Sequence, residues 1–164
     1  MNGFFDWAYT GAPFQLFGTA HLIALGVIGL IILLLPQMRG HEKAQRIFRY
    51  GVAGLLVVNE LGWHLWHIVN GQWTVQTMLP LHLCSVLVFV SAAMLVTEKY
   101  RMFEFVYFMG IAGALQALLT PDLTIHGFPH YRFWQTYISH GGIVIAAVFM
   151  AVVVGYRPTW RSLL

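Results

Sequence analysis

Charged residues are scarce in this sequence. Of its 164 residues, 9% are Asp, Glu, Lys or Arg while 59% are hydrophobic, and the mean hydropathy is +0.70. A soluble domain carries about 25% charged residues, so this chain lacks the polar side chains that would cover a surface exposed to water. The composition excludes a soluble globular protein and indicates that the chain lies in a lipid bilayer.

Other features are also missing. The single cysteine, Cys84, excludes an internal disulfide. The basic residues do not alternate with exposed aromatic residues in a polar context, which excludes a nucleic-acid-binding face although the formal net charge is +3. The first residues, MNGFFDWAYTGAPF, contain neither a positive region nor a small-residue cleavage site, so no cleavable signal peptide is expected.

Long apolar runs are abundant. Five of them approach the roughly 20 residues that a membrane-crossing helix needs, and short polar connections join them. The runs are continuously apolar and lack the alternation of barrel strands, which favours helices. The sequence therefore predicts an all-α, polytopic transmembrane helix bundle that forms one domain over residues 1–164. The expected spans are 16–36, 50–69, 79–97, 102–120 and 134–155.

The basic residues indicate an orientation. Eight of the nine fall on one side of the expected membrane, and Arg132 is the exception. The eight are Arg39, Lys43, Arg46, Arg49, Lys99, Arg101, Arg157 and Arg161. The positive-inside rule assigns their side to the cytoplasm. We therefore expect a multi-pass protein of the cell membrane with its N-terminus outside and its C-terminus in the cytoplasm.

Polar residues inside the spans gather near the predicted outer ends. At a rise of 1.5 Å per residue, all of them lie at a similar depth in different helices, which predicts one polar pocket that opens toward the outer leaflet. The residues concerned are His21, His64, His67, His82, Cys84, Gln116 and His140.

Two stretches add carboxylates to this predicted pocket. In NELGWHLWH, Glu60, His64 and His67 are spaced i, i+4 and i+7, and so share one face of a helix. Glu60 is the deepest of them, where an ionisable side chain normally faces a partner or a cavity. Asp122 follows Pro121 in the predicted outer loop, either as a turn residue or as an acceptor for a histidine below it.

These residues allow several chemistries. Cys84 could act as a nucleophile with His140 or His64 of another helix as its base, because His82 lies about 200° away from Cys84 on a regular helix. Alternatively, His82 and His140 could act with a hydroxyl such as that of Ser85. Glu60, His64 and His67 could bind Zn²⁺ together with His82 or His140, and two facing histidines could hold haem. The histidines could also serve only as hydrogen-bonding contacts between helices.

Three short motifs suggest a family. The sequences LPLHLC, QALLTPDL and YISHGG resemble the YwaF-type family of bacterial integral membrane proteins. That family is similar to animal multispanning acyltransferases that transfer fatty acyl chains into ether phospholipids and, more distantly, to androgen-induced-type lipid hydrolases that pair a threonine with a histidine. Family members tend to be longer, with further helices after the fifth.

The resemblance assigns roles by position. It implies that His140 and His82 match the family's two histidines. The acyltransferase cysteine directly precedes the second of these, where this chain has Leu81, and Cys84 lies one turn further along.

We therefore expect a lipid acyltransferase or acyl-ester hydrolase that acts on a phospholipid or lysophospholipid, without a metal or other cofactor. Its expected catalytic residues are Cys84, His140 and His82, and its expected substrate-binding residues are His64, His67, Glu60, Gln116 and Asp122. The alternative is a metal- or solute-binding membrane protein that performs no covalent catalysis.

Overall fold

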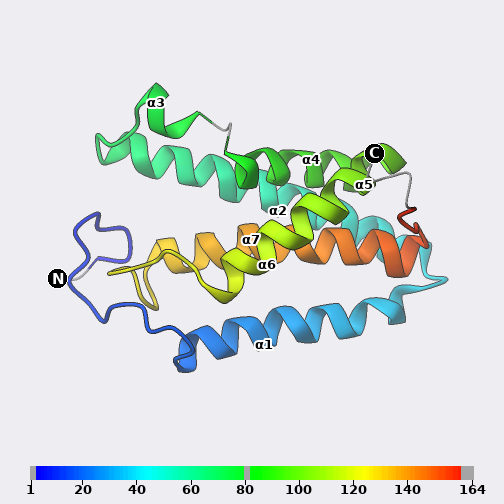
Figure 1. The fold of residues 1–164 in the computed structure, drawn as a ribbon, viewed down its shortest axis with the longest axis horizontal. Coiled ribbons are helices and arrows are strands. Elements are labelled where there is room, and N and C mark those ends of the chain that lie inside the picture. Colours follow the sequence, from blue (N-terminus) through cyan, green and yellow to red (C-terminus); the bar gives the residue numbers. More distant parts are fainter. Residues whose placement is uncertain (1–2, 80–81, 160–164) are drawn as a thin grey trace.

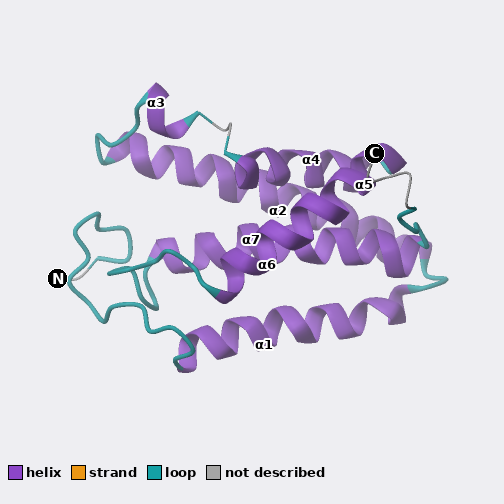
Figure 2. Ribbon diagram, in the orientation of Figure 1, coloured by secondary structure: helices purple, strands orange, loops and turns teal. Residues whose placement is uncertain are grey.

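The computed structural model describes residues 3–79 and 82–159, and this part of the chain is helical without a strand (Figure 2). The predicted all-α fold is confirmed. Pro80 and Leu81 of the third expected span, and Arg161 of the basic set, lie outside the described residues.

Four helices are long and apolar enough to cross a membrane. They run over Thr19–Met38, Glu42–Val69, Tyr100–Leu119 and Tyr131–Val154. The first joins α1 (Thr19–Leu34) to a 3-10 turn, η1 (Leu35–Met38), and the second is α2 (Glu42–Val69). The third joins α5 (Tyr100–Phe105), a π-helical turn η2 (Val106–Gly110) and α6 (Ile111–Leu119). The fourth joins α7 (Tyr131–Phe149) to the π-helical turn η3 (Met150–Val154).

The third expected span, 79–97, is shorter than predicted. Helix α4 covers Leu83–Thr97, and a separate short helix, α3 (Val75–Met78), precedes it. Its 15 residues extend about 22 Å, less than the roughly 30 Å of a bilayer's hydrocarbon core. The sequence placed the start of this helix at residue 79, but His82 has extended backbone angles (φ −64°, ψ 139°).

Helix α2 begins eight residues earlier than the predicted residue 50. Its polar first turns are held by Arg49, whose Nε donates to the carbonyl of Leu95 at 2.6 Å and whose Nη1 pairs with the carboxylate of Glu98. Arg49 thereby satisfies a carbonyl at the end of α4, where helices leave acceptors without partners. These tertiary contacts extend the helix beyond its apolar stretch.

Helix α7 lies at the centre of the bundle, with α1, α2, α4 and α6 packed around it (Figure 1). Small residues allow this close packing. A Cβ added at Gly141 would lie 2.7 Å from Ile28 of α1, and one at Gly142 would lie 2.7 Å from Leu56 of α2. Glycine at such positions lets membrane helices approach each other closely, so α7 packs closely against both α1 and α2.

Two segments cover one end of the bundle, and we call residues 3–18 and 120–130 together the cap (Figure 1). The amide of Phe14 donates to the carbonyl of Thr124 at 3.0 Å, which joins the two segments. The amide of Tyr131 and the indole Nε1 of Trp66 donate to the carbonyls of Phe4 and Phe5. The cap is therefore bonded both to itself and to the ends of α2 and α7.

The opposite end of the bundle, in its connections and the first turns of α2 and α5, carries the described basic residues other than Arg132 (Figure 1). Arg39 donates from Nε to the carbonyl of Val152 at 2.8 Å, and the hydroxyl of Tyr100 donates to the carbonyl of Arg157 at 2.7 Å. The charge asymmetry that the sequence predicted between the two ends is present in the fold. Which end faces the cytoplasm stays a prediction.

Candidate functional site

A cavity of about 410 Å³ lies between α2, α4, α6 and α7 and reaches the first residues of the cap loop. We call it the polar cavity. Helices α4 and α6 diverge from their connection toward the cap end (Figure 1), and the cavity is lined by residues of both. Its lining includes five of the eight expected catalytic and substrate-binding residues, namely Cys84, His140, Glu60, Gln116 and Asp122.

Cys84 is the second residue of α4 and is half-buried in the polar cavity. The first N–H groups of a helix have no acceptor within it, and their partial positive charge favours an anion nearby. A thiolate, or an oxyanion formed beside it, would benefit from this position. Ser85 lines the same cavity, so the fold leaves both candidate nucleophiles beside the same space.

His140 reaches the polar cavity from the third turn of α7. Its Nδ1 lies 2.9 Å from the carbonyl oxygen of Thr136. A carbonyl can only accept, so Nδ1 carries the proton and Nε2 keeps a lone pair. Fixing the tautomer through a hydrogen bond to the other ring nitrogen is how a histidine is prepared as a base. His140 is therefore oriented to accept a proton at Nε2.

Glu60 lies in the middle of α2, is 2% exposed and lines the polar cavity. Its Oε1 has no hydrogen-bond partner among the described residues. The nearest charged or polar group recorded is Nε2 of His64, at 3.8 Å. Burying an unsatisfied carboxylate oxygen costs free energy, so Glu60 is a strong candidate for contact with a hydroxyl or ammonium group inside the cavity.

Asp122 and Arg132 stand where the polar cavity meets the cap. The guanidinium Nη2 of Arg132 donates to the backbone carbonyl of Asp122 at 3.0 Å, and its Cζ lies 5.0 Å from the ring centre of Trp63. Arg132 was not among the site residues expected from the sequence. Its isolation from the other eight basic residues was the available indication.

A hydrogen-bonded cluster supports the cavity between α2 and α7. The side-chain amide of Asn59 donates to Ser139 Oγ at 2.7 Å and to the carbonyl of Gln135 at 3.1 Å. The amide of Gln135 also donates to Ser139 Oγ at 3.3 Å. These residues fix α7 against α2 next to Glu60. Neither Gln135 nor Ser139 stands out in the sequence, because their roles depend on the facing helix.

The histidines of separate spans do not meet in one pocket, so that expectation is wrong. Among the described lining residues, His140 is the only histidine in the polar cavity. His82 is exposed, because α4 starts after it and the helical spacing that oriented it does not apply. His64 accepts a hydrogen bond from Trp73 Nε1 at 3.2 Å.

His67 and His21 have structural contacts instead. The Nδ1–H of His67 donates to the carbonyl of Trp63 at 2.9 Å, and its ring packs against Trp7, Trp63 and Trp66. His21 is fully buried and bonds to both α6 and the start of its own helix. Helical spacing fixes the depth of these rings but not the neighbours that they contact.

The proposed Zn²⁺ ligands also point apart. His67 directs Nδ1 to its own helix, while His64 approaches Glu60 at 3.8 Å. Over residues 3–79 and 82–159, no group of three or more His, Cys, Asp or Glu side chains is arranged to hold a metal ion.

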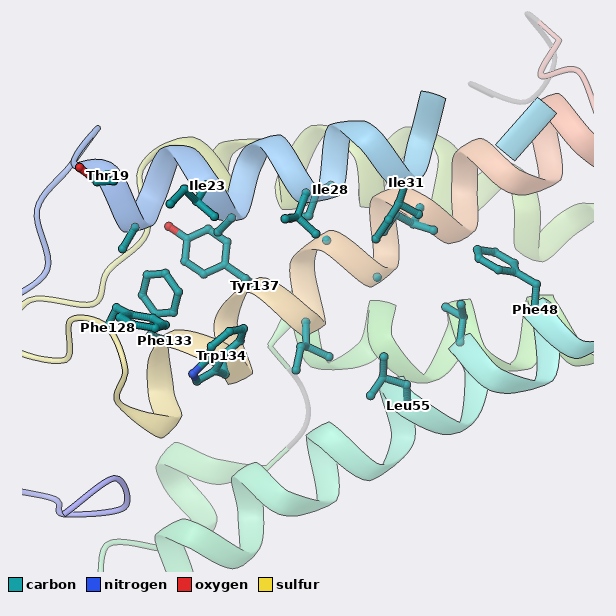
Figure 3. Close-up of a pocket in the computed structure, with 18 residues that line it drawn as sticks. Thr19, Ile23, Ile28, Ile31, Phe48, Leu55, Phe128, Phe133, Trp134 and Tyr137 are labelled. Atoms are coloured by element: carbon teal, nitrogen blue, oxygen red, sulfur yellow. The ribbon is translucent and has the colours of Figure 1, made fainter. Parts of the chain in front are cut away.

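A second cavity, of about 600 Å³, lies between α1, α2 and α7, and we call it the apolar groove (Figure 3). Isoleucines of α1 and aromatic rings of α7 and the cap face each other across it (Figure 3). The described residues that line it include no histidine, cysteine or charged side chain. Its α7 residues include Ile138 and Gly142, which lie about 200° around that helix from His140 and so nearly opposite it. Acid–base chemistry is thus confined to the polar cavity.

A sequence model of the TMEM164 family matches residues 16–164, which include every helix described above. Neither a curated protein nor a solved structure matches the chain. The resemblance to the YwaF-type bacterial family is therefore wrong. It depended on three short motifs in Leu- and Ala-rich helices, where such strings are weakly discriminating, whereas the family match covers nearly the whole chain. This membrane protein belongs to the TMEM164 family.

Proposed function

We propose that this protein is a membrane-embedded lipid acyltransferase or acyl-ester hydrolase, with Cys84 as its nucleophile and His140 as its general base. One observation carries the proposal. The only cysteine of the chain and a histidine with an available Nε2 come from different helices and line the same polar cavity. A nucleophile paired with an oriented base is the arrangement that covalent acyl transfer needs.

The reaction proceeds in two halves. Nε2 of His140 takes the thiol proton of Cys84 while Sγ attacks the ester carbonyl of a phospholipid. The tetrahedral intermediate collapses, the C–O bond breaks, and His140 protonates the departing lysophospholipid alkoxide. A thioester remains on Cys84. A hydroxyl of a second lipid, or water, then attacks it with His140 again as base, which regenerates the thiol.

Other residues of the polar cavity support these steps. The first-turn N–H groups of α4 and the side chain of Gln116 are positioned to donate to the oxyanion. Glu60 offers an unpaired oxygen to the acceptor hydroxyl. Gly113 and Ala117 of α6 and Cys84 of α4 line the polar cavity, and we expect a lipid to enter from the bilayer between these two helices while its ester stays inside.

The single cysteine makes the proposal easy to test. A lipid-like thiol-reactive probe is expected to label Cys84, and incubation with a phospholipid is expected to leave an acyl group on the same residue, detected by mass spectrometry. His140→Ala should slow both reactions about 10²- to 10⁴-fold, the usual contribution of a general base. Cys84→Ala should abolish acyl transfer.

Two control variants separate the rival assignments. Ser85→Ala should retain acyl transfer if Cys84 is the nucleophile, and His82→Ala should retain it because His82 is outside the polar cavity. Full acyl transfer by Cys84→Ala would refute the assignment of the nucleophile, and loss of transfer in Ser85→Ala alone would favour the hydroxyl.

We also propose that the cap and the mouth of the polar cavity lie on the extracellular side of the cell membrane. This orientation is supported by the concentration of basic residues at the opposite end. In the cysteine-free Cys84→Ala background, a cysteine introduced at exposed Thr10 should react with a membrane-impermeant maleimide in intact cells. Labelling only after permeabilisation would reverse the orientation.

A further inference from the structure

Arg132 is the only basic residue at the cap end of the bundle among the described Lys and Arg residues. The positive-inside rule explains the seven described basic residues at the other end, but it does not explain this one. Among the described residues that line the polar cavity, Arg132 is also the only Lys or Arg side chain. Its position therefore requires a local explanation.

The protein holds the Arg132 side chain in place while leaving donors available. Nη2 bonds to the Asp122 carbonyl at 3.0 Å, and the guanidinium lies over the ring of Trp63. A guanidinium has five N–H donors in a fixed plane. Within the described part of the chain, no carboxylate forms an ion pair with Arg132. The group is only partly buried, so the other donors stay at the cavity mouth.

The depth of Arg132 matches a lipid headgroup. It is the second residue of α7, and the helix from Tyr131 to Val154 has 24 residues. At 1.5 Å per residue it extends about 36 Å, which exceeds the roughly 30 Å hydrocarbon core. The first turn of α7 therefore lies at headgroup level, whereas His140 lies about 12 Å deeper along the helix.

We propose that Arg132 binds the phosphate diester of the phospholipid or lysophospholipid whose ester or hydroxyl reaches Cys84. This rests on the proposed function. Arginine binds phosphate through two parallel N–H···O bonds, and its planar group stacks on aromatic rings as it does here on Trp63. The position of Arg132 at headgroup level, beside a cavity between membrane-spanning helices, favours a membrane lipid over a soluble phosphate as the source.

The carboxylates of the cavity limit the charge that it accepts. Asp122 and Glu60 line the same space as Arg132. A phosphodiester brings one negative charge, but a phosphomonoester brings up to two, and the second is repelled by these carboxylates. The site is thus selective for diester headgroups, and Asp122→Asn, which keeps the backbone carbonyl that holds Arg132, relaxes this preference.

Binding of two lipids with the same acyl chain tests the proposal without requiring turnover. Radiolabelled lysophosphatidylcholine and monoacylglycerol are titrated onto the purified full chain in detergent. The wild type should bind the lysophospholipid more tightly. Arg132→Gln should weaken its binding roughly ten- to hundredfold, the value of a hydrogen bond to a charged group, and leave monoacylglycerol binding unchanged. The affinity of Arg132→Lys for the lysophospholipid should fall between those of the wild type and Arg132→Gln.

Arg46→Gln is the matched control, because Arg46 also lies over an aromatic ring, that of Tyr50 at 5.9 Å, but at the other end of the bundle. It should not change either affinity. Glycerophosphocholine, which has the phosphodiester but no chain, should compete weakly. If glycerophosphocholine competes as strongly as the lysophospholipid, the ligand is a soluble phosphodiester and the proposal is overturned.

Equal affinity of the wild type for the two lipids would also overturn the proposal, whether or not Arg132→Gln folds. The same holds if Arg132→Gln or Arg132→Lys weakens the binding of both lipids equally. The outcome is separable from that of the proposed function. If the protein binds the lysophospholipid more tightly but no acyl group appears on Cys84, the role of Arg132 stands and that of Cys84 is refuted. An acyl-enzyme on Cys84 without discrimination would do the reverse.

Discussion

His21 provides the sharpest test of how the structure separates structural from chemical histidines. Its Nδ1 accepts a hydrogen bond from the amide of Phe17 at 2.9 Å, so Nε2 carries the proton and donates to the carbonyl of Leu118 at 2.9 Å. The side chain is fully buried and lines neither cavity. His21→Leu therefore removes a link between α1 and α6 but nothing that touches a substrate.

The expected loss of stability follows from these two bonds. Leucine fills a similar space, so the main cost comes from the buried Leu118 carbonyl and the partly buried Phe17 N–H, which both lose their partner. Each such group costs about 1–3 kcal/mol, although hydrogen bonds between membrane helices fall toward the lower end of that range. Together they give about 2 kcal/mol, which corresponds to a fall of roughly 4–8 °C in Tm for a chain of this size.

Thermal unfolding in detergent, followed by size-exclusion chromatography with tryptophan fluorescence, measures this change. His41→Leu is the matched control, because His41 is exposed and makes no side-chain capping bond at the start of α2. It should unfold close to the wild type. Acyl transfer per folded molecule should be unchanged in His21→Leu. An unaltered Tm, or a folded variant without transfer, would contradict this account of His21.

Three further predictions concern the cap and the polar cavity. Burial lowers the pKa of His130 below its ordinary value of 6.5. Its Nδ1 accepts a hydrogen bond from the amide of Arg132 at the start of α7, and protonation of Nδ1 breaks this bond. The stability that the bond contributes is therefore present above pH 6.5 and lost as the pH falls below it, and hydrogen exchange of residues 3–18 should become faster at low pH. If exchange there is equally slow at pH 5 and pH 7.5, the coupling is refuted. A Cβ at Gly127 would overlap backbone atoms of the facing cap segment, whereas one at Gly26 meets nothing within 4 Å, so Gly127→Ala should lower Tm and Gly26→Ala should not; equal Tm values would refute the close approach. Gly113→Phe should obstruct the proposed lipid entry between α4 and α6 and slow acylation of Cys84, while Gly26→Phe should not, and equal acylation rates would show that lipid enters elsewhere.

Much of the fold could be read from the sequence, for a clear physical reason. A bilayer requires helices of a fixed length with continuous apolar surface, and such runs are visible without knowledge of their neighbours. The predicted ends failed at α2 and α4. There, tertiary bonds of Arg49 extended one helix, and the extended backbone at His82 delayed the other.

The candidate site could be predicted only in part. The depth of Cys84, Glu60, Gln116 and His140 follows from counting residues along each helix, and all four line the polar cavity. Counting gave the same depth to His64, His67 and His82, which do not line it. Depth does not specify the direction of a side chain relative to the other helices, and this direction determines which groups can react together.

By itself, the sequence determined the membrane as solvent, the helical class and the asymmetry of charge between the two ends, because hydropathy and charge act on each segment separately. Only the tertiary structure decided which of the polar side chains share a space. That depends on how α7 packs among its neighbours through Gly141 and Gly142, and on the cap that brings Asp122 to Arg132. Both are contacts between residues that are distant in the sequence.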